Sequence, residues 1–205
     1  MGVVIGITGG IATGKTTVAR MFEDLGAERM DADQVARDVL QPGSDTAKSV
    51  IEAFGPTVLA PDGSIDRAEL GAVIFADPSA REQLNRITHP PIIRRLRQRI
   101  KEFRSRPAGT AALVIEIPLL VEANLTRMVD RVLLVRAEQD EQRNRLRMRG
   151  GLTAEQIDQR IGSQMPVCDK TPYADWVVDT GCPLEKTRSQ VLRIWKQVQD
   201  GIRAL

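Results

Sequence analysis

Short runs of nearly continuous apolar residues alternate along this chain with longer segments in which apolar residues recur every three or four positions. Short apolar runs are typical of strands that are buried on both faces of a parallel sheet. They occur at residues 3–8, 111–118, 131–135 and 176–179, and a shorter candidate strand lies at 27–33. Helical spacing marks residues 15–25 and 184–199. The alternation predicts an α/β fold with a parallel sheet.

The segment from about residue 34 to residue 107 departs from this pattern. It contains short amphipathic helices and turns, no strong strand, and a basic helix near its end. A long helical insertion between two core strands predicts a lobe that holds an acceptor substrate. His89, the single histidine of the chain, lies inside it. A lone histidine is more often a satisfied structural residue than a catalyst, although its imidazole can titrate near neutral pH.

Residues 9–16 follow the first predicted strand directly and fit the pattern Gly-x-x-x-x-Gly-Lys-Ser/Thr of a phosphate-binding loop. Glycines let successive backbone N–H groups point into one hollow, and the N-terminus of the next helix adds further donors. Lys15 can reach the β- and γ-phosphates of a nucleoside triphosphate, and the Thr16 hydroxyl can coordinate Mg²⁺. The residues expected to contact the nucleotide are Gly9, Gly10, Ile11, Ala12, Thr13, Gly14, Lys15, Thr16 and Thr17.

The alternative interpretation of this motif is a glycine-rich turn between an ordinary strand and an ordinary helix. The surrounding sequence argues against it, because the helix at 15–25 carries an apolar face and Gly26 follows where a left-handed C-terminal cap is expected. Strand, loop and helix thus occur in the order that a phosphate-binding loop requires.

Three carboxylates stand at the ends of predicted strands. Asp31 and Asp33 end the second strand and share a face if the chain stays extended, and Glu116 ends the third. Ligands of open α/β sheets bind at the carboxyl ends of the strands. One of the two aspartates is equally a candidate to cap a helix that starts near Gln34. Glu116 is a candidate ligand of Mg²⁺ or of its water shell, with a hydrogen bond to the phosphate loop as an equal alternative.

An arginine-rich helix pair precedes the last predicted strand, and Gly150-Gly151 offers a hinge between the two helices. Arg145 and Arg149 are four residues apart on the first helix and share a face. With Arg160 of the second helix they could close over a polyphosphate as a lid. The alternative is a solvated arginine face.

Composition narrows the class of protein. The chain has 205 residues, 42% hydrophobic content and a net charge of +2, so it lacks the one-signed excess of a general nucleic-acid binder. Two cysteines, Cys168 and Cys182, and an N-terminal apolar run interrupted by glycines predict a cytoplasmic protein with free thiols and no secretory leader. The most apolar later stretch, 111–125, is broken by charges and a proline, so no membrane span is expected. We expect a monomer or a weak homo-oligomer.

Across nearly its full length the sequence resembles the dephospho-CoA kinase family. The resemblance rests on Thr8-Gly9-Gly10-Ile11 leading into the phosphate loop, Asp31-Ala32-Asp33, Ile87-Thr88-His89-Pro90, Ile117-Pro118-Leu119-Leu120 followed by Glu122, Arg160 with Ser163-Gln164-Met165-Pro166, and Lys170 with Ala174-Asp175. The chain departs from the family pattern in that Glu116 stands where Asp is usual and Thr180 where Asn is usual.

The resemblance implies an adenylate-kinase-like fold, a three-layer P-loop NTPase with about five parallel strands. It also implies transfer of the ATP γ-phosphoryl group to the ribose 3′-hydroxyl of dephospho-CoA, which gives coenzyme A and ADP in the last step of coenzyme A synthesis. The single kinase domain would then comprise a core at 1–33, 108–137 and 171–205, an acceptor lobe at 34–107 and a lid at 138–170.

The resemblance also suggests roles for single residues. Asp33 would accept the proton of the 3′-hydroxyl, with Lys15 and Arg149 as further catalytic groups. Arg149 and Arg160 would contact ATP, and Thr16 would hold Mg²⁺, with Glu116 as a second candidate. The acceptor contacts would be Asp31, Asp33, His89, Glu116 and Leu119.

Two other functions fit part of the same pattern. A nucleoside or nucleoside-monophosphate kinase shares the phosphate loop, the inserted lobe and the arginine lid, and differs only in its acceptor. A regulatory GTP-binding switch is disfavoured, because the chain has no Asn-Lys-x-Asp sequence for guanine and carries a long helical insertion in place of short switch segments.

Overall fold

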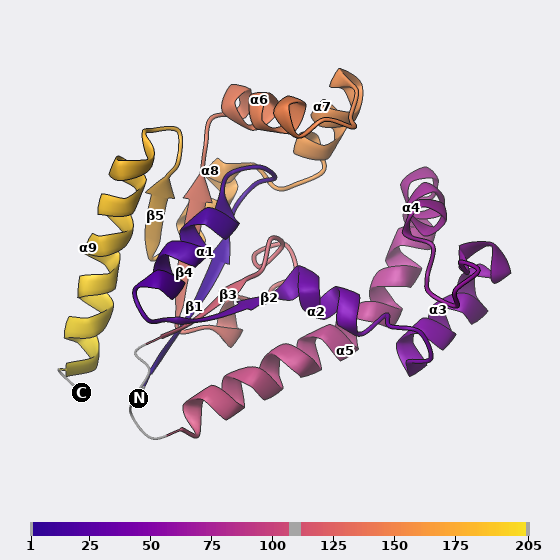
Figure 1. Ribbon diagram of the computed structural model, residues 1–205, viewed down its shortest axis with the longest axis horizontal. Coiled ribbons are helices and arrows are strands. Elements are labelled where there is room, and N and C mark those ends of the chain that lie inside the picture. Colours follow the sequence, from indigo (N-terminus) through magenta and orange to yellow (C-terminus); the bar gives the residue numbers. More distant parts are fainter. Residues whose placement is uncertain (1, 107–111, 204–205) are drawn as a thin grey trace. The chain divides into compact units, whose positions relative to one another are not determined.

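The computed structural model describes residues 2–106 and 112–203. Within this part of the chain five parallel strands form one sheet in the order β2-β3-β1-β4-β5 (Figure 1). The strands are β1 Val3–Thr8, β2 Glu28–Asp31, β3 Ala112–Glu116, β4 Arg131–Arg136 and β5 Trp176–Asp179. Every residue of β3 is buried, as expected of a central parallel strand. The predicted first residue of this strand, 111, lies outside the described residues.

Helices connect and follow these strands. They are α1 Lys15–Asp24, α2 Ala32–Asp38, α3 Asp45–Phe54, α4 Arg67–Ala76, α5 Pro78–Arg104, α6 Gln139–Arg149, α7 Ala154–Gly162, α8 Val167–Lys170 and α9 Leu184–Arg203. Short 3-10 helices lie at η1 Pro56–Val58, η2 Thr126–Met128 and η3 Thr171–Tyr173. In the described part of the chain no helix is both long and apolar enough to cross a bilayer.

One boundary differs from the sequence-based expectation and bears on the site. The strand predicted at 27–33 ends at Asp31, and α2 begins at Ala32 rather than near Gln34. Asp33 therefore lies in the first turn of a helix, and the extended chain that would have put Asp31 and Asp33 on one face is not formed. A carboxylate in the first turn interacts favourably with the positive end of the helix dipole. Asp33 therefore stabilises a helix that begins at Ala32, which explains the earlier start.

Residue contacts divide the chain into two compact units. One unit combines Met1–Asp31 with Glu102–Leu205 and contains the whole sheet, and the other is Ala32–Lys101. The second unit is helical and has its own core, built around Val50 and Val58. The sequence-based boundary at 107/108 lies outside the described residues.

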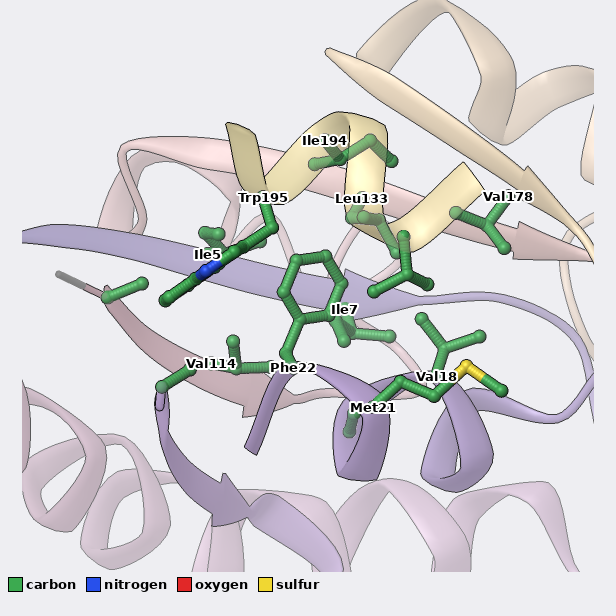
Figure 2. Close-up of a cluster of buried hydrophobic side chains, with 14 of the residues drawn as sticks. Ile5, Ile7, Val18, Met21, Phe22, Val114, Leu133, Val178, Ile194 and Trp195 are labelled. Atoms are coloured by element: carbon green, nitrogen blue, oxygen red, sulfur yellow. The ribbon is translucent and has the colours of Figure 1, made fainter. Parts of the chain in front are cut away.

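The main core of the sheet unit lies between the sheet and the helices α1 and α9 (Figure 2). Ile5 and Ile7 of β1 point toward this core, where they belong to one cluster with Phe22 of α1 and Trp195 of α9. The rings of Phe22 and Trp195 meet edge to face, with centroids 6.2 Å apart and planes at 67°. Burial of β1 and of α1 fixes both ends of the loop that joins them. That loop is the predicted phosphate loop.

The other face of β1 is tightly covered as well. A Cβ added at Gly6 would lie 2.9 Å from a side-chain carbon of Leu120 and 3.2 Å from Val129, so the segment after β3 packs directly on the backbone of β1. The predicted α/β class, a parallel sheet flanked by helices, is confirmed.

Candidate active site

The phosphate loop has a backbone that requires glycine at its first position. Gly9 has φ +149°, and a Cβ at this residue would lie only 2.1 Å from the carbonyl oxygen of Val135 in β4. Gly14 at the end of the loop has φ +89°, and Ala12 also adopts a positive φ of 57°. The loop thus combines a left-handed backbone with close approach to a neighbouring strand, which are the two uses of glycine in such loops.

Hydrogen bonds from other segments hold the loop in this shape. The Thr13 hydroxyl donates to the carbonyl of Gly10 at 2.9 Å, and the Thr180 hydroxyl donates to the carbonyl of Thr13 at 2.6 Å. Arg145 of α6 donates to the carbonyl of Ala12 at 3.2 Å and to the carbonyl of Thr180 at 2.6 Å. Arg145, which the sequence analysis assigned to a possible lid, therefore binds the loop itself. Thr180 stabilises the loop through its hydrogen bond to Thr13.

The N-terminus of α1 follows the loop directly, and its backbone N–H groups are not occupied by any described capping or acidic side chain. Its N-cap residue is Gly14, and among the described residues no side chain caps this helix and no acidic residue lies in its first turn. Lys15 donates from Nζ to the carbonyls of Gly9 at 3.1 Å and Gly10 at 2.8 Å, so its ammonium lies across the loop. An uncapped helix N-terminus with a nearby lysine is suited to bind phosphate.

Thr16 is joined to two other residues that lie far from it in the sequence. The Thr16 hydroxyl donates to Glu116 Oε2 at 2.8 Å. The other carboxylate oxygen, Oε1, accepts a hydrogen bond from Nε of Arg29 in β2 at 2.8 Å and forms an ion pair with Nη2 of the same guanidinium at 2.7 Å. Thr16 belongs to the phosphate-loop motif, so the structure contains the hydrogen bond to this loop that was one of the two interpretations of Glu116.

Arg29 was missed by the sequence analysis. It alternates with Asp31 along β2 and so shares a face with it, and this two-residue spacing is the signal that could have placed it at the site. Burial by itself would lower the pKa of the Arg29 guanidinium. The hydrogen bond and charge of Glu116, together with the charges of Glu23 and Asp31, outweigh burial and raise this pKa above its ordinary value.

The residues at Thr16 fit a magnesium ion. A hydroxyl that donates its hydrogen to Glu116 keeps its lone pairs for a cation, and Mg²⁺ prefers oxygen ligands, often with phosphate and water completing its shell. The described residues contain no group of three or more His, Cys, Asp or Glu side chains that could hold a metal by itself. Magnesium ions in phosphate-transfer sites usually take further ligands from the nucleotide and from water.

The residues predicted to contact the acceptor fall in both units. Asp31 ends β2 beside Glu116 of β3, its partner in the strand register, and Leu119 is 44% exposed on the segment after β3. These lie in the sheet unit. Asp33 is exposed in α2 and His89 is half-buried in α5, and both belong to the helical unit.

The arginine-rich helix pair forms part of the sheet unit. Leu146 of α6 and Ile157 of α7 form a small buried cluster with Ala12 of the phosphate loop. Thr153 and Gln156 form a capping box at the start of α7. Among the arginines, Arg143 joins the two helices through Asp158 at 2.7 Å. Arg149 and Arg160, by contrast, are exposed near the C-terminal ends of α6 and α7.

A second group of residues at this site was not assigned a role from the sequence. Gln164 follows α7, and its Oε1 accepts a hydrogen bond from the backbone N–H of Ile11 at 2.7 Å. Lys170 has no exposed surface and forms an ion pair with Glu122 at 2.7 Å. Its Nζ also donates to the carbonyl of Pro118 at 3.4 Å, which accepts from the Thr8 hydroxyl at 3.0 Å. Gln164 and Lys170 belong to the motifs quoted above for the family resemblance. Their presence in those motifs was the signal that could have assigned them to the site.

Comparison with known proteins agrees with this geometry. A family model described as dephospho-CoA kinase matches residues 3–185. The chain is 44% identical to a dephospho-CoA kinase of Geobacillus kaustophilus over 96% of this chain and 97% of that protein. It is 43% identical to one of Carboxydothermus hydrogenoformans over 94% of each. A crystal structure of TT1252 from Thermus thermophilus superposes with a TM-score of 0.81 at 28% identity and covers 96% of this chain and 97% of that one. The chain belongs to the dephospho-CoA kinase family.

Proposed function

We propose that this chain transfers the γ-phosphoryl group of ATP to the ribose 3′-hydroxyl of dephospho-CoA, giving coenzyme A and ADP. The observation that carries this proposal is the phosphate loop at an uncapped helix N-terminus, in a chain that matches the dephospho-CoA kinase model over residues 3–185. Membership of the family supports dephospho-CoA as the acceptor. The phosphate loop supports a nucleoside triphosphate as the donor.

The protein activates ATP by placing positive charge and hydrogen-bond donors beside its phosphates. Lys15 moves from the loop carbonyls to the β- and γ-phosphoryl oxygens, where its ammonium stabilises the charge that develops during transfer. Backbone N–H groups of residues 9–17 contact the phosphates. Thr16 holds the magnesium ion, and Glu116 accepts the hydrogen of the Thr16 hydroxyl. The ion supplies charge neutralisation and orientation of the phosphates when it is bound.

On the acceptor side the reaction needs a group that takes a proton from the attacking hydroxyl. We assign this role to Asp33, because a carboxylate is a suitable general base and because its position matches the family motif Asp31-Ala32-Asp33. Asp31, His89 and Leu119 are assigned to binding of dephospho-CoA. Residues 34–107 then act as the acceptor lobe.

Arg149 and Arg160 are proposed to contact the phosphates when residues 138–170 act as a lid. Both side chains are exposed, and Gly150 and Gly151, both with positive φ, separate their helices. A flexible pair of glycines between two short helices supports closure on nucleotide binding. Arg149 would screen the charge on the transferred group.

We further infer a cytoplasmic monomer or weak homo-oligomer that acts on small molecules and binds neither nucleic acid nor membranes. Both cysteines are free, which suits a reducing compartment. A net charge of +2 gives no large basic excess. Size-exclusion chromatography with light scattering tests the oligomeric state.

The test of the proposed function is one assay with Mg²⁺, ATP and a panel of acceptors. Dephospho-CoA, AMP, CMP, adenosine and pantothenate are each supplied, and ADP and the phosphorylated product are measured. Strong turnover of dephospho-CoA, with little turnover of the other four acceptors, supports the proposal. Preferential turnover of AMP, CMP or adenosine would instead identify a nucleotide or nucleoside kinase.

A further inference from the structure

The carboxylate of Glu116 is shared between two partners in a way that links β2 to the metal-binding hydroxyl. Oε1 accepts a hydrogen bond from Nε of Arg29 and is paired with its Nη2, and Oε2 accepts the hydrogen bond from Thr16. Glu116 is only 4% exposed. Each of its oxygens therefore has a defined partner, Arg29 at Oε1 and Thr16 at Oε2.

We propose that Arg29 is a positioning residue that orients Thr16 toward the magnesium ion through Glu116. The proposal rests on the proposed function in so far as it takes Thr16 as the residue that holds the ion. Arg29 itself contacts neither the nucleotide nor the metal in this account.

The first argument is orientational. Thr16 is exposed, and its hydroxyl hydrogen rotates toward the best available acceptor. Glu116 Oε2 fixes that hydrogen, so the lone pairs of the hydroxyl point away from β3. The Arg29 fork binds Oε1 with two donors and thereby sets the rotation of the carboxylate. Without Arg29 the carboxylate can turn, and the hydroxyl loses its fixed direction.

The second argument concerns charge. A buried carboxylate without a cationic partner would attract a divalent ion directly, with Glu116 competing against Thr16 and the phosphates as a ligand. Arg29 neutralises this carboxylate and occupies Oε1. Arg29 is itself largely buried, with 20% of its side chain exposed, and has a second, longer contact to Glu23 at 3.7 Å. The guanidinium is thus held in place from two sides.

A purely structural role is the competing explanation, because Arg29 also joins the edge strand β2 to β3. The two explanations differ in what they predict for nucleotide binding. A structural defect weakens binding with or without Mg²⁺. A positioning defect weakens only the part of the binding that depends on Mg²⁺.

The experiment measures the affinity for a non-hydrolysable ATP analogue by calorimetry, once with Mg²⁺ and once with EDTA. In Arg29→Met we expect the affinity with Mg²⁺ to fall about 10-fold, the lower end of the range typical for loss of a direct partner of a metal ligand, because Arg29 acts on Thr16 through Glu116. The affinity in EDTA should stay unchanged. Arg29→Lys, which keeps the charge and one donor, should recover part of the loss.

Arg106→Met is the matched control. Arg106 forms an ion pair at 2.8 Å with Glu28 at the start of the same strand, so this variant also removes an arginine that binds a glutamate near β2. It should bind the analogue like the wild type under both conditions. Adding Arg29→Met to Thr16→Val should cause little further loss of affinity with Mg²⁺, because the hydroxyl that Arg29 orients through Glu116 is already gone.

Equal loss with Mg²⁺ and with EDTA, or no loss at all, would overturn the proposal for Arg29. If Arg29→Met does not fold, Arg29→Gln, which retains a donor and most of the aliphatic stem, is measured in its place under the same criteria. Failure of the proposed function is seen separately, in the acceptor assay, and failure of the magnesium assignment to Thr16 has its own signature. In that case the wild type itself would show no gain in affinity from Mg²⁺.

Discussion

The side-chain oxygen of Gln164 accepts a hydrogen bond from the backbone N–H of Ile11 at 2.7 Å, across 153 residues of sequence. This bond ties the end of the arginine-rich helix pair to the phosphate loop. Two further bonds reinforce it nearby, because Glu122 accepts from the backbone of Met165 at 3.4 Å and pairs with Lys170. Residues 164–170 are thus an anchor, and we expect closure of the proposed lid to be carried by the residues before them.

The first prediction follows from this anchor and concerns hydrogen exchange. Adding Mg²⁺ and a non-hydrolysable ATP analogue should slow amide exchange in α7 and around Gly150, because Arg149 and Arg160 gain a partner only when phosphates are present. Residues 164–170 should be protected already without ligand. Equal exchange in α7 with and without the analogue would contradict the lid.

The ion pair of Lys170 and Glu122 should be important for stability. Lys170→Met removes the partner of Oε1 in a largely buried carboxylate whose Oε2 accepts no hydrogen bond among the described residues, and such a loss typically costs about 3–5 kcal/mol. Thermal and urea unfolding measure this cost. The double variant Lys170→Met with Glu122→Gln should regain much of it, because no buried charge is left unpaired.

The matched control for this pair is Lys48→Met, which breaks an exposed ion pair with Asp45. Exposed pairs typically contribute about 0–1 kcal/mol, so the unfolding free energy should hardly change. If Lys170→Met were as mild as Lys48→Met, the anchor would have no energetic basis.

Gly9→Ala tests the steric requirement of the phosphate loop. The added methyl group would lie 2.1 Å from the carbonyl oxygen of Val135, so the loop must leave its place against β4. We expect loss of nucleotide binding by calorimetry and a lower midpoint of thermal unfolding. Gly26→Ala is the control, since Gly26 also has a positive φ of 99° but open space around it, and it should cost only about 1–2 kcal/mol with binding retained. Equal effects of the two substitutions would refute the steric explanation.

The sequence predicted the phosphate loop and its neighbours well because the signals there are local. The order of strand, glycine loop and helix and the cap at Gly26 each depend on residues a few positions apart. Propensity, backbone conformation and periodicity act over the same short distance.

The missed contacts are those between distant segments. Arg29 meets Glu116 across 87 residues, and Arg145 meets Ala12 across 133. A pattern along the chain shows that an arginine is polar but not which carboxylate or carbonyl the fold brings to it. The early start of α2 was missed for a local reason, since Asp33 suits the first turn of a helix as well as the end of a strand.

Asp33→Asn tests the assignment of the general base. The amide keeps the size of the side chain but cannot accept the proton, and general-base catalysis typically contributes about 100- to 10,000-fold, so kcat should fall by that order. The affinity for dephospho-CoA, measured by calorimetry, should change little. Asp31→Asn is the matched control and should reduce kcat less. Near-normal kcat in Asp33→Asn would move the catalytic role elsewhere, with Glu116 as the next candidate.

The central claim is that residues 9–17 hold ATP so that its γ-phosphoryl group passes to the ribose 3′-hydroxyl of dephospho-CoA. The most direct measurement follows ATP labelled in the γ-phosphoryl group, incubated with Mg²⁺ and dephospho-CoA, for the wild type and for folded Lys15→Ala. We predict that the wild type places the label on the 3′-oxygen of coenzyme A and that Lys15→Ala, which lacks the ammonium that stabilises the developing charge, nearly abolishes the transfer. Label found only in inorganic phosphate, or transfer by Lys15→Ala at the wild-type rate, would contradict it.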